Sequence, residues 1–300
     1  MPTDLFECVV NVSEGRDTRT LGRLAAAAGE TLLDVHRDPD HHRAVLTMAG
    51  PADAVALGAR AVAGAVVDSL DLAEHAGVHP RLGVLDVVPF VPYEPGAATP
   101  FDLSGAVALR DAFAHWLGTE LGVPVFLYGP LPGGATRPLP EVRRHAFGEA
   151  RAGGLAPDYG PGRPDPRTGA TAVGARRVLV AYNVWVSSVE VAREVAAAVR
   201  GPEVRALGLA VGGRAQVSCN LVDPDLAGPA ALYDAVSPLV RGAGGAVEGA
   251  ELVGLIPERV LRVVPRRRWA ELGLSEEATV EARLAGRWTE ARCAPGETGR

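Results

Sequence analysis

Short apolar runs alternate with longer amphipathic stretches through the first 91 residues. The short runs have the length and composition of buried strands, whereas the longer stretches repeat Leu, Val and Ala at helical spacing. In chain order they predict strand 7–12, helix 17–28, strands 31–35 and 43–48, helix 55–70 and strand 84–91. The order is therefore β-α-β-β-α-β, which is typical of the split βαβ, ferredoxin-like unit.

The same order returns in the second half of the chain. Its segments predict strand 177–185, helix 188–199, strands 204–211 and 215–222 joined at Gly212-Gly213, helix 225–240 and strand 247–255. Each unit forms a sheet with helices on one face, so the bare face of each sheet needs a cover. We therefore predict an α/β (α+β) fold of two ferredoxin-like βαββαβ subdomains, 1–175 and 176–300, packed with a cleft between their sheets.

The segment between the two units carries a predicted helix at 101–121, a strand at 123–128 and a short helix at 140–149. Residues 155–174 follow, with four prolines and four glycines in twenty residues. This composition predicts a loop, and loops of this length in compact domains are usually functional or linkers. We predict either a plain interdomain linker or a segment that lines the cleft, where small-molecule sites prefer to form.

Composition limits the class of protein. Hydrophobic residues make up 47% and charged residues 22%, which describes a globular chain, and the net charge of −6 gives no footprint for nucleic acid. The chain contains no lysine, which excludes lysine Schiff-base and Walker-type chemistry. Cys8, Cys219 and Cys293 are widely spaced, so we expect no disulfide framework and no zinc motif. Without a leader peptide or a membrane-spanning run, we expect a cytoplasmic protein with no membrane partner.

The segment His79-Pro-Arg81 lies between a predicted helix and a predicted buried strand. Proline disfavours the helical conformation for the residue before it, so His79 should be extended and presented on a stiff loop at the edge of a sheet. Such an imidazole is a candidate general acid or base near neutral pH. A single loop histidine is also common as a surface or hydrogen-bonding residue.

A second polar segment joins two predicted strands of the first unit. It contains His36, Asp38, Asp40, His41 and His42, and Asp34 lies near the end of the strand before it. These residue types could hold Zn²⁺ or Mn²⁺, so a metal hydrolase is one alternative function. The adjacent His41 and His42 weaken it, because neighbouring side chains of an extended chain point to opposite sides. A non-enzymatic protein that binds a small ligand is the other alternative.

Seven motifs run from residue 7 to residue 257. They are Glu7-Cys-Val-Val-Asn-Val-Ser-Glu-Gly15, His79-Pro-Arg-Leu-Gly-Val-Leu-Asp-Val-Val-Pro-Phe90, Gly122-Val-Pro-Val-Phe-Leu-Tyr-Gly129, Ala156-Pro-Asp-Tyr-Gly-Pro161, Gly169-Ala-Thr-Ala-Val-Gly-Ala-Arg176, Ala215-Gln-Val-Ser-Cys-Asn-Leu221 and Glu251-Leu-Val-Gly-Leu-Ile-Pro257. Together, and in this order, they resemble the glutamate formimidoyltransferase family in its stand-alone form, without the cyclodeaminase domain.

The resemblance implies two ferredoxin-like subdomains with a folate site between them, assembled as a homodimer. It implies transfer of a formimino group from N-formimino-L-glutamate to N5 of tetrahydrofolate, in histidine degradation and one-carbon metabolism. Tetrahydrofolate would be the co-substrate, and no metal is expected. The loops 36–42 and 162–168 depart from the family pattern. A diverged one-carbon or amidine transferase with another donor or acceptor is therefore a further alternative.

The resemblance places the family's catalytic histidine on His79. One imidazole could take a proton from the attacking amine and return it to the glutamate nitrogen. It also places the folate-contacting loop on 160–169, which contains Gly160, Pro161, Gly162, Arg163, Arg167, Thr168 and Gly169.

Other candidate site residues follow from their chemistry. Arg43, Arg81, Arg163 and Arg167 could bind substrate carboxylates with their forked guanidinium groups, although each could also be a solvated surface residue. Gln216 and Asn220 have the same parity on a predicted strand and therefore share one face. The possible charge partners of the positively charged formimino group, chosen by position, are Asp34, His36, Asp38, Asp40 and His42.

Overall fold

The computed structural model describes residues 5–98, 102–146 and 154–293. The first predicted unit is confirmed in type and order. It consists of β1 (Leu5–Val12), α1 (Thr18–Ala28), β2 (Leu32–Asp38), β3 (Arg43–Pro51), α2 (Ala52–Ser69) and β4 (Leu85–Tyr93). These strands pair antiparallel in the order β2-β3-β1-β4, which is the ferredoxin-like arrangement.

The first sheet is larger than the sequence predicted. It continues beyond β4 through β7 (Thr171–Ala175), β5 (Val125–Pro130) and β6 (Thr136–Arg137) to seven strands. Helix α3 (Ser104–Glu120) precedes β5, and α4 (Leu139–His145) follows β6. For α3 we predicted a start at 101, and for α4 an end at 147–149. These positions lie outside the described residues.

The prediction of a loop over 155–174 is wrong at its end. Thr171–Ala175 is a fully buried strand, parallel to both of its neighbours, β4 and β5. Its residues are small and form no long apolar run, so the local sequence did not indicate a strand. The loop before it therefore belongs to the first sheet, and only residues 176–179 join that sheet to the second.

The second predicted unit is also confirmed. It consists of β8 (Val180–Val186), α5 (Val189–Ala198), β9 (Val204–Val211), β10 (Arg214–Leu221), α6 (Pro229–Gly242) and β11 (Val247–Val253). The strands pair antiparallel in the order β11-β8-β10-β9, again the ferredoxin-like arrangement. Strand β8 begins three residues later than predicted. Helices α7 (Glu258–Arg262) and α8 (Val280–Cys293) follow.

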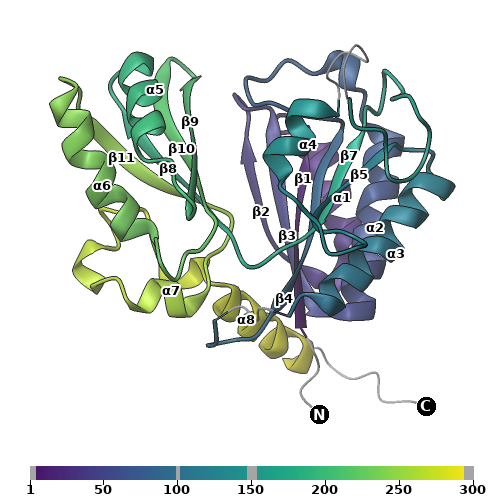
Figure 1. Cartoon of the computed structure of the whole chain (residues 1–300). Coiled ribbons are helices and arrows are strands. Elements are labelled where there is room, and N and C mark those ends of the chain that lie inside the picture. Colours follow the sequence, from purple (N-terminus) through teal and green to yellow (C-terminus); the bar gives the residue numbers. More distant parts are fainter. Residues whose placement is uncertain (1–4, 99–101, 147–153, 294–300) are drawn as a thin grey trace.

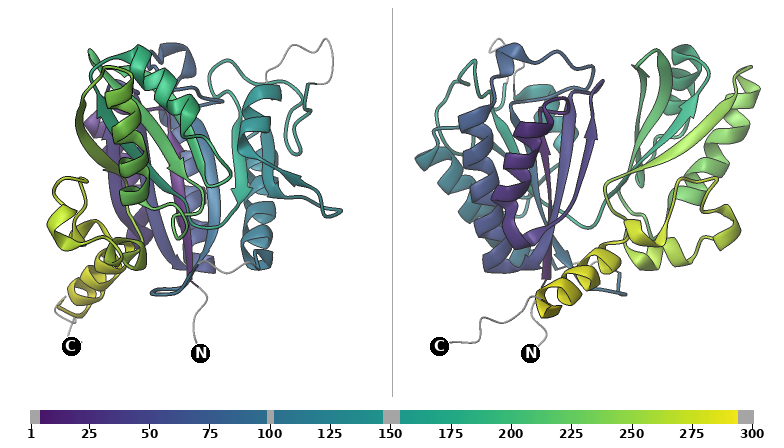
Figure 2. Two further views of the ribbon diagram at one scale, coloured as in Figure 1. Left: turned by 60° about the vertical axis from the view of Figure 1, so that its left-hand side comes forward. Right: turned by 180° about the vertical axis from the view of Figure 1, so that it is seen from behind.

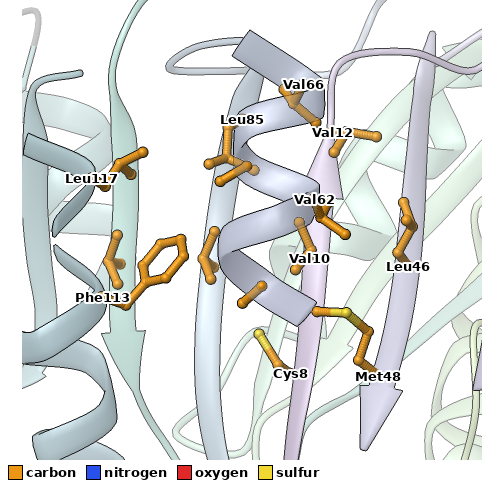
Figure 3. Close-up of a cluster of buried hydrophobic side chains, with 14 of the residues drawn as sticks. Cys8, Val10, Val12, Leu46, Met48, Val62, Val66, Leu85, Phe113 and Leu117 are labelled. Atoms are coloured by element: carbon orange, nitrogen blue, oxygen red, sulfur yellow. The ribbon is translucent and has the colours of Figure 1, made fainter. Parts of the chain in front are cut away.

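Period-two alternation along β1 explains how the first sheet is oriented. Cys8, Val10 and Val12 are buried against α2, where they meet Val62 and Val66 (Figure 3). Because successive side chains of a strand point to opposite faces, Glu7 and Asn11 lie on the other face, away from these helices. The polar residues of β1 therefore face the second half of the molecule.

The two sheets face each other, as the sequence predicted, with α1, α2 and α3 on the outer side of the first sheet and α5 and α6 on the outer side of the second (Figures 1 and 2). The short helix α4 lies on the inner side of the first sheet, where Val142 packs with Val87. A small apolar cluster joins the halves, with Ala49 and Val91 of the first sheet packed with Leu255 and Val280. Polar contacts cross the same interface, including His36 Nε2 to Glu251 Oε1 at 3.6 Å. Among the described residues, no helix is both long and apolar enough to cross a membrane.

Candidate active site

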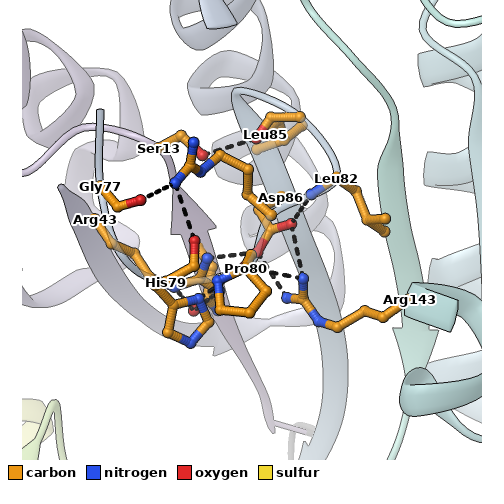
Figure 4. A network of polar contacts seen from close by, with 12 residues as sticks. Ser13, Arg43, Gly77, His79, Pro80, Leu82, Leu85, Asp86 and Arg143 are labelled. Carbon is orange, nitrogen blue, oxygen red and sulfur yellow. Dashed lines mark hydrogen bonds and ion pairs between the residues drawn. The ribbon is translucent and has the colours of Figure 1, made fainter. Parts of the chain in front are cut away.

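The centre of the candidate site is Asp86, a fully buried carboxylate on β4. It binds Nη1 of Arg43 at 2.5 Å and Nη2 of Arg143 at 2.7 Å, and it accepts the Leu82 amide at 2.7 Å (Figure 4). Burial alone would raise the pKa of this carboxyl, but the two guanidinium groups outweigh it and hold the pKa far below its usual range. Asp86 is therefore a permanent anion that fixes two arginines.

His79 lies beside this network. Its Nδ1 is 2.7 Å from the carbonyl oxygen of Pro80. A carbonyl can only accept, so Nδ1 carries the proton and Nε2 keeps its lone pair. Burial, then the charge of Arg43, lowers the pKa of His79 well below 6.5, and Asp86 only partly opposes them. The ring is therefore a neutral imidazole with Nε2 as its basic nitrogen.

The position of His79 depends on a close approach between two backbone segments. The Val84 amide donates to the Thr168 carbonyl at 3.0 Å, and the Ala170 amide donates to the Leu82 carbonyl at 3.1 Å. A Cβ on Gly83 would lie 2.4 Å from two carbonyl oxygens of the neighbouring segment, so only glycine fits there. The start of β4, and with it the His79 loop, is thereby held against the start of β7.

The β2–β3 turn supplies two more imidazoles. The ring of His41 lies 5.7 Å from that of His79, centroid to centroid. The ring of His42 stacks on that of His75 with the centroids 4.2 Å apart, and His42 Nε2 is 3.2 Å from Glu14 Oε1. Burial lowers the pKa values of His41, His42 and His75. The His79 loop therefore packs against a turn of neutral histidines.

The structure brings Arg43 and Arg81 to the site but gives them different contacts. Arg43 binds Asn11 Oδ1 through Nε and Nη2, at 3.2 and 2.8 Å, as well as Asp86. Arg81 donates to the carbonyl oxygens of Gly77 and His79, so it holds its own loop. Both guanidinium groups nevertheless stand on the face of the sheet where His79 lies.

The predicted folate loop is split between two environments. Thr168 and Gly169 are buried next to the Leu82–Val84 segment. The stretch from Gly160 to Arg167 is exposed, and Arg163 lies within it. Arg167 directs Nη2 to the Val67 carbonyl at 2.9 Å, at the end of α2 and therefore on the helix-covered side of the sheet. Only the end of this loop adjoins the His79 segment.

The second sheet reaches the site through its β9–β10 hairpin. A Cβ on Gly212 would lie 2.4 Å from Asp40 Oδ2, so this hairpin touches the β2–β3 turn. Gln216 is fully buried, and both polar atoms of its side chain lack a hydrogen-bond partner within the described part of the chain. Asn220 lies on the same strand face, as its parity predicted, but is exposed.

The proposed metal-binding cluster does not form. Asp34 pairs with Arg283 at 3.6 Å, His36 with Glu251, and His42 with Glu14. Asp38 accepts the amides of Asp40 and His41. In the described ranges, no three His, Cys, Asp or Glu side chains are placed to share a metal ion. The turn geometry thus separates residues that are close together in the sequence.

Two important residues were not identified from the sequence. Asp86 is an acid inside a strand that is otherwise apolar, and this signal could have indicated a buried partner. Arg143 lies 57 residues further along the chain, on the short helix α4, and no local pattern relates it to Asp86. In Figure 4 Arg143 approaches Asp86 from the side of α4.

Comparison with known proteins places this geometry in a family. The family model described as the formiminotransferase domain, N-terminal subdomain, matches residues 5–176. Glutamate formimidoyltransferase of Streptococcus pyogenes is 33% identical over 279 residues, which cover 86% of this chain and 90% of that protein. The protein of the same name from Thermoplasma acidophilum is 32% identical over 303 residues, with 93% and 97% covered.

A longer relative matches over part of its length. Formimidoyltransferase-cyclodeaminase of Sus scrofa is 34% identical over 282 residues, which cover 86% of this chain and 51% of that protein. The chain therefore spans about half of that fused relative but nearly all of the two shorter ones. By family model and by relatives alike, the chain belongs to the formiminotransferase family.

Proposed function

We propose that this protein transfers the formimino group of N-formimino-L-glutamate to N5 of tetrahydrofolate, with His79 as the group that moves the proton. The observation that carries the proposal is the neutral His79 imidazole, whose Nε2 keeps its lone pair beside three arginines. In a chain of this family, such a ring meets the need of the reaction for a base near neutral pH.

The reaction joins an amine to an amidinium carbon. N5 of tetrahydrofolate attacks the formimino carbon, and a tetrahedral intermediate with three nitrogens forms. His79 Nε2 takes the proton from N5 and gives it to the glutamate nitrogen, after which the bond between that nitrogen and the carbon breaks. The products are 5-formiminotetrahydrofolate and glutamate, and His79 returns to its neutral state.

The arginines are proposed to bind the anionic part of the donor. Asp86 neutralises one of the two charges of Arg43 and Arg143, and Arg81 adds a further cation. The surplus positive charge favours a carboxylate, and a guanidinium can bind it with two parallel hydrogen bonds. We therefore propose that the glutamate carboxylates of the donor bind on the side of Arg43 and Arg81.

The folate is proposed to lie between the two sheets. Support comes from buried polar atoms on their facing sides that lack a hydrogen-bond partner within the described residues, on Thr47 of β3 and Gln216 of β10. Such atoms are costly to bury unless a partner is supplied. The loop 160–169 would contribute through Thr168 and Gly169. We further propose a cytoplasmic homodimer, which light scattering of the purified protein would test.

The decisive experiment is to incubate the protein with tetrahydrofolate and N-formimino-L-glutamate and to identify the product by mass. Formation of 5-formiminotetrahydrofolate is the expected result. Binding of tetrahydrofolate without product would instead indicate a diverged transferase with another donor, or a binding protein. Absence of both product and binding would refute the proposed acceptor.

A further inference from the structure

Charges of opposite sign surround the imidazole rings of His79 and His41. Arg43 and Arg143 are the cations that act most strongly on His79. The charged groups that act on His41 are the carboxylates of Asp38, Glu251 and Asp40, opposed by Arg43. The two rings are only 5.7 Å apart, so the site changes from cationic to anionic over the width of a small molecule.

His41, like His79, has an oxygen atom facing Nδ1, although at a longer distance. Its Nδ1 lies 3.5 Å from Asp38 Oδ2. A carboxylate beside Nδ1 favours the tautomer with the proton on Nδ1, which leaves Nε2 as an acceptor. His41 is only 7% exposed, and Nε2 has no hydrogen-bond partner in the part of the chain that the structure describes. A buried acceptor of this kind needs a donor.

We propose that His41 Nε2 accepts a hydrogen bond from the terminal nitrogen of the donor's amidinium group and so determines specificity for amidine over acyl donors. The inference rests on the proposed function and extends it to a residue for which neither the sequence nor the family resemblance assigned a role in transfer. The amidinium would lie beside the two rings, with its charge toward Asp38, Asp40 and Glu251 and its carbon toward His79.

The chemistry of the two donor classes explains the selectivity. An amidinium presents N–H groups on both of its nitrogens and has no acceptor. The corresponding formyl donor keeps the N–H of the glutamate nitrogen but has an oxygen in place of the terminal nitrogen, and that oxygen would meet the His41 lone pair with another lone pair. Burial lowers the pKa of His41, and a neutral ring with its proton on Nδ1 has no Nε2 proton to offer that oxygen. One fixed acceptor can therefore separate formimino from formyl donors.

The second sheet takes part in this arrangement. Glu251 of β11 is 3.6 Å from His36 Nε2 and accepts Asn183 Nδ2 at 3.4 Å. Its negative charge also acts on His41, on the other half of the molecule. The acidic side of the site is thus complete only when the two sheets are together.

The test compares two donors and three variants. Binding of N-formimino-L-glutamate and of N-formyl-L-glutamate is measured by calorimetry, with and without tetrahydrofolate. His41→Phe removes the acceptor and keeps a ring, whereas His41→Gln keeps an acceptor oxygen. The backbone amide of His41, which is held by Asp38, remains in both variants. His115→Phe on the exposed surface of α3 is the control, and thermal melting checks that each variant folds.

We expect the wild-type protein to prefer the formimino ligand and His41→Phe to lose roughly 10- to 100-fold of this preference, as for one hydrogen bond to a charged group. His41→Gln should retain most of the preference. An unchanged ratio in a folded His41→Phe protein would overturn the inference while leaving the transferase reaction intact.

The converse result is also distinguishable. Selective binding that depends on His41, in a protein that forms no product, would support the inference and refute the proposed transfer. Failure of the wild-type protein to bind the formimino ligand would overturn both.

Discussion

The Asp86 carboxylate accepts a 2.7 Å hydrogen bond from the Arg143 guanidinium, and this contact ties helix α4 to strand β4. Arg143 also donates through Nη1 to the Pro80 carbonyl at 3.2 Å. That carbonyl is the same one that accepts the Nδ1 proton of His79. Asp86 and Arg143 are therefore linked to the His79 imidazole through the backbone of the next residue.

Replacement of Asp86 by Asn should be strongly destabilising. It leaves Arg43 and Arg143 without their shared anion in a largely buried site, and loss of one partner of a buried pair costs about 3 kcal/mol or more. Urea unfolding measures the change. Glu276→Gln is the matched control, because the pair of Glu276 with Arg266 at 3.8 Å is exposed. The control should differ from wild type by about 0.5 kcal/mol or less. Equal stabilities of the two variants would contradict a structural role for the network.

Replacement of His79 by Ala should abolish most turnover and leave the fold intact. The side chain is half-buried and lies on a loop, so its loss removes little packing, whereas general acid–base catalysis contributes roughly 10²- to 10⁴-fold. The ratio of kcat/KM values for the wild-type and variant proteins tests this. His115→Ala, on the exposed surface of α3, should have wild-type activity. Near-native turnover in folded His79→Ala would exclude the assigned role.

The pH dependence of kcat/KM should show the cationic surroundings of His79. Its pKa is held well below 6.5, so the neutral, active form persists below that pH and the acidic fall in rate begins only there. Arg143→Gln removes one cation that lowers this pKa, so the fall should move to higher pH. Arg143→Lys keeps the charge and should leave the fall in place, although it alters the geometry. Identical profiles for the Gln variant and wild type would show that this charge does not act on the catalytic group.

Glu7 should make stability decrease with pH. It is buried on β1, and burial raises its pKa from 4.5 to about 7, an effect that Arg176 only partly offsets. Between these two values the native state binds more protons than the unfolded state, so stability falls as pH rises and then levels off above about 7. The shift corresponds to about 3 kcal/mol.

Glu7→Gln removes this titration and keeps the shape of the side chain. The stability of the variant relative to wild type should therefore increase between pH 4.5 and pH 7 and stay constant above it. Thermal unfolding at pH 5 and pH 8 measures the difference. A relative stability that is the same at both values would show that Glu7 titrates normally in the folded protein.

The sequence by itself determined the two ferredoxin-like units. Cys8, Val10 and Val12 alternate with Val9 and Asn11, and this period of two is a property of neighbouring residues that needs no partner to be recognised. The prediction of an extended backbone at His79 likewise rests on a neighbouring residue, because Pro80 restricts the residue directly before it. The chain order of the elements then limited the possible sheet topologies to very few.

Only the tertiary structure decided which distant residues meet. The small residues of β7 form a strand because β4 and β5 cover both of its edges, and a parallel pairing leaves no signal in either strand alone. Arg143 reaches Asp86, whereas Arg167, which has the same chemistry, turns to the Val67 carbonyl. A charged side chain carries no information about its partner, since Coulomb attraction acts through space and the fold alone sets the distance.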